Sequence, residues 1–169
     1  TAATFATAKV AWNNVSGAFK NFASATGLTA TADQAAQDAS TNRALGIRQT
    51  GSFGDPGAAF VFQLSNTTGR SNIAMSFKLQ SLDASSARTT TWQVDYAVGD
   101  NPTTFTSATA TGTLAVGNSS FSNNTITVNL PAAVANQSQP VWIRILTTTA
   151  STGAGSRAST AVDDVTFTW

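Results

Sequence analysis

Two neighbouring carboxylates near the end of the chain are the first candidates for chemistry. Asp163 and Asp164 open the last alternating run of the sequence. Two carboxylates at such a junction can share a hard divalent ion such as calcium, which relieves their mutual repulsion. Further oxygen ligands are predicted among Asp33, Asp38 and Asn42, whose position in space the spacing does not fix. The alternative, in which Asp163 caps a turn at a solvated strand entry, fits the spacing equally well.

Aromatic side chains form a second group of candidates, because a flat ring matches the C–H face of a sugar. The group comprises Trp12, Trp92, Tyr96, Trp142 and Trp169. An aromatic residue that alternates with valine is more often a core residue, so Trp92, Tyr96 and Trp169 are predicted to be buried. Trp142 differs, because it shares its face of the strand with Arg144, opposite three aliphatic residues. The pattern predicts Trp142 to be an exposed platform.

Polar side chains on the non-core faces of the predicted strands supply the hydrogen bonds that a sugar site needs. Amide, carboxylate and guanidinium groups can bind neighbouring hydroxyls in pairs. These candidates are Arg48, Lys78, Gln80, Gln93, Asp95 and Arg144. Each one alone is more simply explained as keeping a sheet soluble, but their recurrence on several strands favours a shared site. Asp55, Arg88 and Arg157 lie in predicted loops and are candidates for its rim, where the two arginines favour an acidic or sulfated glycan.

Several kinds of active site are excluded by residue types that the chain lacks. The 169 residues include no histidine and no cysteine, and all eight acids are aspartates. A Ser-His-Asp triad, a thiol nucleophile, a disulfide and a cysteine-ligated metal are therefore excluded. Two aspartates can serve a glycosidase, but Asp83, Asp95 and Asp100 are divided between a strand face and turns. The sequence predicts a protein that is not an enzyme.

The charges predict neither a nucleic acid nor a membrane as the partner. Nine basic and eight acidic residues give a net charge of +1, and the basic residues are scattered singly. Phosphate binding needs a concentrated basic face instead, and no apolar run reaches the ~18 residues of a membrane span. Low charge, absent cysteine and abundant Thr, Ser and Asn are typical of exported bacterial proteins, so we expect an extracellular or cell-surface location.

Alternation of apolar and polar residues predicts strands along most of the chain. The strands expected are 43–50, 60–64, 73–80, 89–98, 104–114, 125–130, 141–146 and 162–169, separated by turns rich in Gly, Pro and Asn. Roughly nine strands at this spacing indicate an all-β fold, an antiparallel β-sandwich of jelly-roll type with little helix. Residues 1–41 are less readable. We assign them to the same single domain, 1–169, as a loop with about one helical turn after Asp33.

Four segments resemble β-sandwich modules of large secreted bacterial proteins. The segments are Asn42–Thr50, Ser52–Ala58, Thr91–Tyr96 and Val162–Val165. Such modules are attached to polysaccharide-degrading enzymes and secreted nucleases, and many are similar to jelly-roll carbohydrate-binding modules. The resemblance covers residues 42–169 and implies an accessory, non-catalytic role. It also implies a structural calcium, because an Asp before the last strand often helps to hold one in such modules, and Asp163 matches that position.

These observations predict a secreted, non-catalytic carbohydrate-binding module. It would be a monomeric part of a larger chain, and it would hold an attached enzyme near a polysaccharide. The alternative is a cell-surface adhesion domain or a structural spacer of a multidomain secreted protein. Calcium is the one cofactor expected, and its role would be structural.

Overall fold

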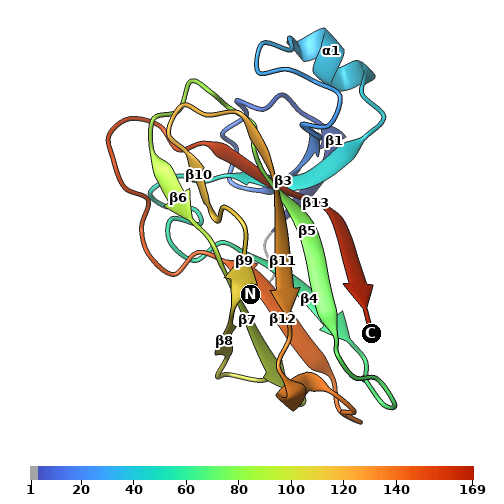
Figure 1. Ribbon diagram of the computed structural model, residues 1–169. Coiled ribbons are helices and arrows are strands. Elements are labelled where there is room, and N and C mark those ends of the chain that lie inside the picture. The colour runs from blue at the N-terminus through green and yellow to red at the C-terminus, as the bar shows by residue number, and fades with distance from the viewer. Residues whose placement is uncertain (1–3) are drawn as a thin grey trace.

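The computed structural model describes residues 4–169 of the chain (Figure 1). These residues form thirteen strands, one α-helix and one 3-10 helix, and most of the strands belong to two sheets. The larger sheet has seven strands in the order β1-β2-β3-β13-β5-β11-β9. Their bounds are β1 Phe5–Lys9, β2 Phe19–Ala23, β3 Arg43–Arg48, β5 Ala74–Ser81, β9 Ala110–Thr111, β11 Ser122–Asn129 and β13 Ser159–Thr168.

The second sheet has four strands in the order β4-β12-β7-β8, and a short ribbon pairs β10 with β6. The bounds are β4 Ala59–Leu64, β6 Thr89–Thr91, β7 Gln93–Val98, β8 Thr106–Ala108, β10 Ala115–Gly117 and β12 Val141–Leu146. The helices are α1, Gln34–Ala39, and the 3-10 helix η1, Ala132–Val134. No helix in the described part of the chain has the length and apolar character needed to cross a membrane.

Eight of the strands have the connectivity of a jelly roll. Numbered from one to eight along the chain, they give the sheet orders 1-8-3-6, which is β3-β13-β5-β11, and 2-7-4-5, which is β4-β12-β7-β8. Two such sheets packed face to face are the double Greek key of a jelly roll. All pairs among these eight strands are antiparallel. The predicted all-β, jelly-roll-like sandwich is therefore confirmed.

The strand expected over residues 104–114 is divided between the two sheets. Residues Thr106–Ala108 form β8 and pair with β7 in the four-stranded sheet, whereas Ala110–Thr111 form β9 and pair with β11 in the seven-stranded sheet. The chain thus crosses from one layer to the other in the middle of a Thr-rich run. Alternation alone does not reveal such a crossing, because both halves keep the same two-residue period.

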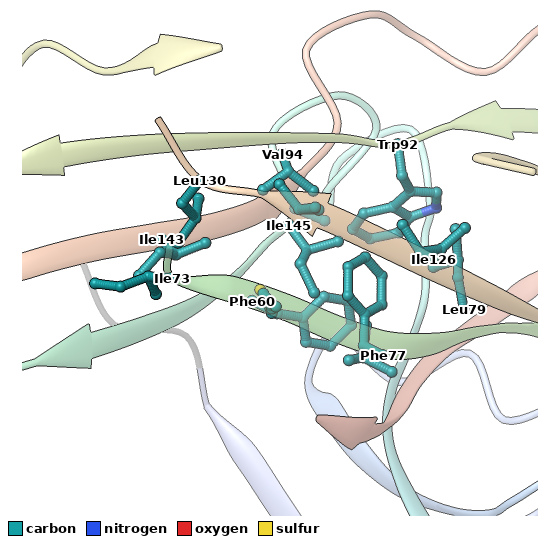
Figure 2. Close-up of a cluster of buried hydrophobic side chains, with 14 of the residues drawn as sticks. Phe60, Ile73, Phe77, Leu79, Trp92, Val94, Ile126, Leu130, Ile143 and Ile145 are labelled. Atoms are coloured by element: carbon teal, nitrogen blue, oxygen red, sulfur yellow. The ribbon is translucent and has the colours of Figure 1, made fainter. Parts of the chain in front are cut away.

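The core lies between the inner faces of the two sheets (Figure 2). Phe77 of β5 and Ile143 and Ile145 of β12 are at most 1% exposed. The rings of Phe60 and Trp92 lie 5.4 Å apart between their centroids. Burying each of these side chains contributes about 1.5–3 kcal/mol. The predicted burial of Trp92 is confirmed, and the alternating residues of β12 face the core as expected.

Trp169 was predicted to be a core residue, and this prediction is wrong. Its alternating neighbours Val165 and Phe167 pack against the core, but Trp169 is 62% exposed. The last pair between β13 and β5 joins Thr168 to Ala74, so Trp169 lies beyond the end of the sheet. There its ring stacks under the Arg70 guanidinium, whose Cζ lies 4.6 Å from the ring centroid.

The N-terminal segment covers part of the outer face of the seven-stranded sheet. Trp12 and Phe22 belong to a second apolar cluster, together with Ala44, Leu82 and Ala161. In Figure 1 this segment, with α1, lies at one end of the sandwich. The helix begins where Asp33 Oδ1 accepts a hydrogen bond of 2.8 Å from the Ala36 N–H, as the N-cap prediction requires. Strand β2 was not predicted, because its two faces pack in different clusters and leave no alternation.

Candidate functional site

The outer face of the four-stranded sheet gathers the predicted aromatic platform and several polar side chains. Trp142 of β12 stands opposite Gln63 of β4, and Arg144 of β12 stands opposite Asp95 of β7. The intervening aliphatic residues of β12 face the core, so Trp142 and Arg144 point outward and are half-buried. Gln93 lies on the same face of β7 as Asp95. The prediction that these side chains share one face agrees with the register.

Arg144 is fixed in place on this face by Asp95 and Phe105. Its Nε and Nη2 bond the two carboxylate oxygens of Asp95 at 2.8 and 2.6 Å, which is a bidentate pair. Its Cζ lies 3.4 Å from the ring centroid of Phe105, a cation–π contact. Within the described residues Nη1 makes no hydrogen bond, so this group is free to donate to a ligand. The Asp95 carboxylate has both oxygens engaged.

The Trp142 ring is oriented by the turn that follows β7. Its Nε1 donates a hydrogen bond of 2.9 Å to the main-chain carbonyl of Gly99. Gly99 has a φ of 115°, which favours glycine, and its N–H bonds the Pro140 carbonyl at 2.9 Å. The indole therefore has one fixed orientation with part of its ring open to solvent. A ring held in this way needs little ordering when it binds a flat ligand.

Gln93 marks the other end of the face. Thr148 Oγ1 donates a hydrogen bond of 3.2 Å to Gln93 Oε1. This bond orients the amide and leaves its Nε2 as a donor toward solvent. The face thus carries an aromatic platform at one end, a guanidinium in the middle and an amide donor at the other end.

Three members of this face were not among the predicted site residues. Gln63 is exposed beside Trp142, and the alternation of Phe60, Phe62 and Leu64 already places it on the outer side. Phe105 and Thr148 lie outside the strands, in connections whose course the residue pattern does not determine. Of these three residues, only Gln63 could have been assigned to this face from the sequence pattern.

Three predicted polar residues lie on the other sheet and do not join this face. Lys78 is on the outer side of β5, where its Nζ bonds Thr125 Oγ1 at 2.7 Å. Gln80 is fully buried, and its Nε2 donates to Ser24 Oγ at 2.8 Å. Arg48 is 7% exposed. Because β3 and β5 belong to the opposite layer, their outer faces point away from those of β7 and β12.

Arg48 forms a buried ion pair with Asp83. Its Nη1 bonds Asp83 Oδ2, and its Nη2 donates to Ser86 Oγ at 3.1 Å. Burial by itself raises the pKa of Asp83, but hydrogen bonds from Ser85 and Ser86 and the Arg48 guanidinium together outweigh burial. The pKa of this carboxyl is therefore below its ordinary value. These contacts indicate a structural role for Arg48.

The predicted rim residues hold together the connection between β12 and β13. Asp55 accepts hydrogen bonds from Ser151 N at 2.6 Å and Ser151 Oγ at 2.7 Å, and it pairs with Arg157. Burial raises the pKa of Asp55, but these bonds and the Arg157 charge more than compensate and lower it. Arg88 donates to the carbonyls of Gly155 and Ser151, both at 3.0 Å. The three residues lie beyond the Gln93 end of the face, and a role as its rim stays a prediction.

The predicted metal ligands form no compact carboxylate cluster. Asp163 Oδ2 accepts a hydrogen bond of 2.6 Å from Ser24 Oγ, and its Oδ1 accepts one of 2.9 Å from the Asp164 N–H. Asn42 reaches the same Ser24 through its main-chain carbonyl, at 3.0 Å from the Ser24 nitrogen. Asp38 lies apart on α1. In residues 4–169 no three His, Cys, Asp or Glu side chains are arranged to hold a metal ion.

Lysine side chains also lie beside Asp163 and beside Asp38, two of the predicted calcium ligands. Lys78 is the register partner of Asp163, and Lys9 Nζ donates to the Asp38 main-chain carbonyl at 2.6 Å. A neighbouring positive charge weakens the attraction of a carboxylate for a divalent cation. The residues present therefore fit a calcium ion poorly, and calcium binding at Asp163 and Asp164 stays a prediction.

No protein-family model matches this chain, and no curated protein or solved structure matches it either. The geometry of the outer face is therefore the basis on which a function can be inferred. A half-exposed indole and neutral or paired polar groups can stack on and hydrogen-bond an uncharged polar ligand with an apolar face.

Proposed function

We propose that this domain is a non-catalytic carbohydrate-binding module, whose site is the outer face of the four-stranded sheet. The observation that supports this proposal most directly is the fixed Trp142 indole beside Gln63 and the Arg144–Asp95 pair. A pyranose would place its C–H face on the indole. Its hydroxyls would receive hydrogen bonds from Arg144 Nη1 and from the amides of Gln63 and Gln93.

The same geometry favours binding over catalysis. The carboxylate on this face, Asp95, is 5% exposed and has both oxygens bonded to Arg144, so it is poorly placed to act on a ligand as a base or nucleophile. Hydrolysis of a glycoside uses two carboxyl groups on either side of the scissile bond. A paired Asp95 suits the other role, which is to orient a guanidinium.

Binding by one such module should be weak, because sugar hydroxyls exchange water for protein partners with little net gain. A tether to an attached enzyme supplies a high effective concentration and makes weak binding useful. The resemblance to modules of secreted bacterial proteins supports this arrangement and an extracellular location. The low charge and the absence of cysteine are consistent with both.

A broad glycan-binding screen that includes neutral, acidic and sulfated polysaccharides tests the proposal. Trp142→Ala should abolish the binding that the intact domain shows. Trp169→Ala is the matched control, because it removes an exposed indole from the end of the other sheet and should leave binding unchanged. Binding of no glycan, or equal binding by both variants, would contradict the proposal and favour the adhesion or spacer alternative.

A further inference from the structure

The two sheets of the sandwich have unequal widths on one side. In a jelly roll β3 lies opposite β4, and β4 is the last strand of its sheet. The seven-stranded sheet continues past β3 with β2 and β1. Within residues 4–169, no strand of the smaller sheet extends under these two. With strands about 4.8 Å apart, the projecting part has the width of about two strands.

An apolar groove of about 630 Å³ lies between this projecting part and β4. Its floor includes Phe5, Phe19 and Leu45, and its wall includes Phe53 and Val61. Phe5, Leu45 and Val61 are 50%, 41% and 52% exposed, which makes them the large apolar side chains most open to solvent after Val15 and Trp169. Every described residue that lines the groove is uncharged. A ligand that fills it must therefore be largely uncharged as well.

Among the residues that the structure describes, no strand pairs with the outer edge of β4, which forms the wall of the groove. The Thr147 N–H donates a hydrogen bond of 3.0 Å to the Ala58 carbonyl. In an antiparallel pair, every second residue makes main-chain hydrogen bonds to the neighbouring strand, so the bonds to β12 recur at every second residue of β4 after Ala58. Main-chain groups of Phe60, Phe62 and Leu64 therefore face β12, and those of Ala59, Val61 and Gln63 face outward. Strand β4 contains no lysine and no proline, the residues that commonly protect an edge from pairing.

We propose that this groove receives one extended peptide strand from another polypeptide, which adds to the edge of β4. Its main chain would pair with the outward groups of Ala59, Val61 and Gln63. Every second side chain would turn toward Phe5 and Leu45, so an uncharged segment with alternating apolar residues fits best. This is strand addition, in which main-chain bonds give affinity and the groove selects side chains.

The shape of the groove favours a single strand over a second copy of the domain. Two copies that paired their β4 edges about a twofold axis would place both larger sheets on the same side. The projecting strands β1 and β2 of one copy would then clash with those of the other copy. A lone strand meets no such obstacle, because the projecting part has the width of about two strands.

The probe for this proposal is a short, end-capped synthetic peptide of alternating valine and threonine, added to the intact domain. At about ten times its Kd, it should slow hydrogen exchange at the Val61 amide about tenfold. The same peptide with N-methylated amides along one edge cannot pair and should give no protection. Equal protection by both peptides, or no protection by either, would overturn the proposal.

Variants of the domain test whether the peptide binds in the groove and whether this site is distinct from the proposed glycan-binding face. Leu45→Lys and Phe5→Lys place a charge in the groove at exposed positions and should abolish peptide binding. Thr106→Lys, on the β8 edge of the same sheet, and Trp142→Ala should leave it unchanged. Sedimentation must show a monomer without peptide. A dimer that protects Val61 on its own would overturn the single-strand proposal in favour of a second copy.

Discussion

The outer faces of the two sheets carry similar residue patterns in very different environments. On the four-stranded sheet, Trp142 and Arg144 are half-exposed. On the seven-stranded sheet, Arg48 and Gln80 occupy the corresponding alternating positions and are 7% and 0% exposed. Gln80 is covered by the residues after β2, where Ser24 and Ala25 share hydrogen bonds with it, and Arg48 is covered by the loop after β5 that carries Asp83 and Ser86. A polar residue on the outer side of a strand is therefore a binding candidate only where no other part of the chain covers its sheet.

The first prediction has the largest expected effect on stability. It compares the loss of one aromatic side chain from the outer face of each sheet. Phe22→Ala removes a fully buried ring under the N-terminal segment and should lower the free energy of unfolding by about 3–5 kcal/mol. Trp142→Ala removes a half-exposed ring with one hydrogen bond and should cost about 1–2 kcal/mol. Urea unfolding at neutral pH measures both. Equal losses would mean that the two faces are equally covered.

The second prediction compares the two ion pairs. Arg48→Met leaves Asp83 buried without its partner and should cost about 3 kcal/mol. Arg144→Met should cost at least as much, because the Asp95 side chain is 7% exposed and loses both of its hydrogen bonds, whereas Asp83 keeps those from Ser85 and Ser86. Arg70→Met, at an exposed position, is the control and should change stability little. A clearly larger loss from Arg48→Met than from Arg144→Met would contradict this ranking.

The third prediction concerns acid. The folded-state pKa values of Asp55 and Asp83 are lowered, so their contribution to stability is complete well above the unfolded pKa of about 3.9 and is lost as pH falls through the folded values. Unfolding free energies at a series of pH values should decline below about pH 5. Asp83→Asn should be less stable at pH 7 and should decline less steeply. An unchanged slope in this variant would show that other groups cause the acid effect.

The smallest expected effect is that of calcium. An ion bound only to the folded state raises the melting temperature by mass action. If Asp163 and Asp164 hold calcium, a chelator should lower the melting temperature by a few degrees, and Asp163→Asn should remove this response. Elemental analysis of the purified domain measures the bound ion directly. No shift with chelator and no detectable ion would refute the site.

The sequence was informative about most of the strands and uninformative about the layer to which each belongs. The alternation of Trp142 and Arg144 against aliphatic neighbours correctly predicted which side of β12 faces the core. A two-residue period cannot say which sheet a strand joins, so Arg48 and Gln80 were grouped with Gln93 although they lie in opposite layers. That assignment depends on pairings between distant parts of the chain.

Two further differences have local physical reasons. Phe105 belongs to the candidate site because a connecting loop brings its ring under the Arg144 guanidinium, and loops of this kind have no periodic signal. Strand β2 escaped prediction because Phe19 packs in the main core while Phe22 packs in the second cluster. A strand with apolar residues on both faces does not alternate.

The pairing of β3 with β13 has a consequence for how the chain folds. These two strands lie side by side in the larger sheet, with Arg48 opposite Ser159, yet they are almost at opposite ends of the sandwich sequence. Contacts between such distant segments close large loops and slow folding. During synthesis, the larger sheet lacks one of its central strands until β13 has left the ribosome. The domain is therefore completed only after nearly all of its residues have been made.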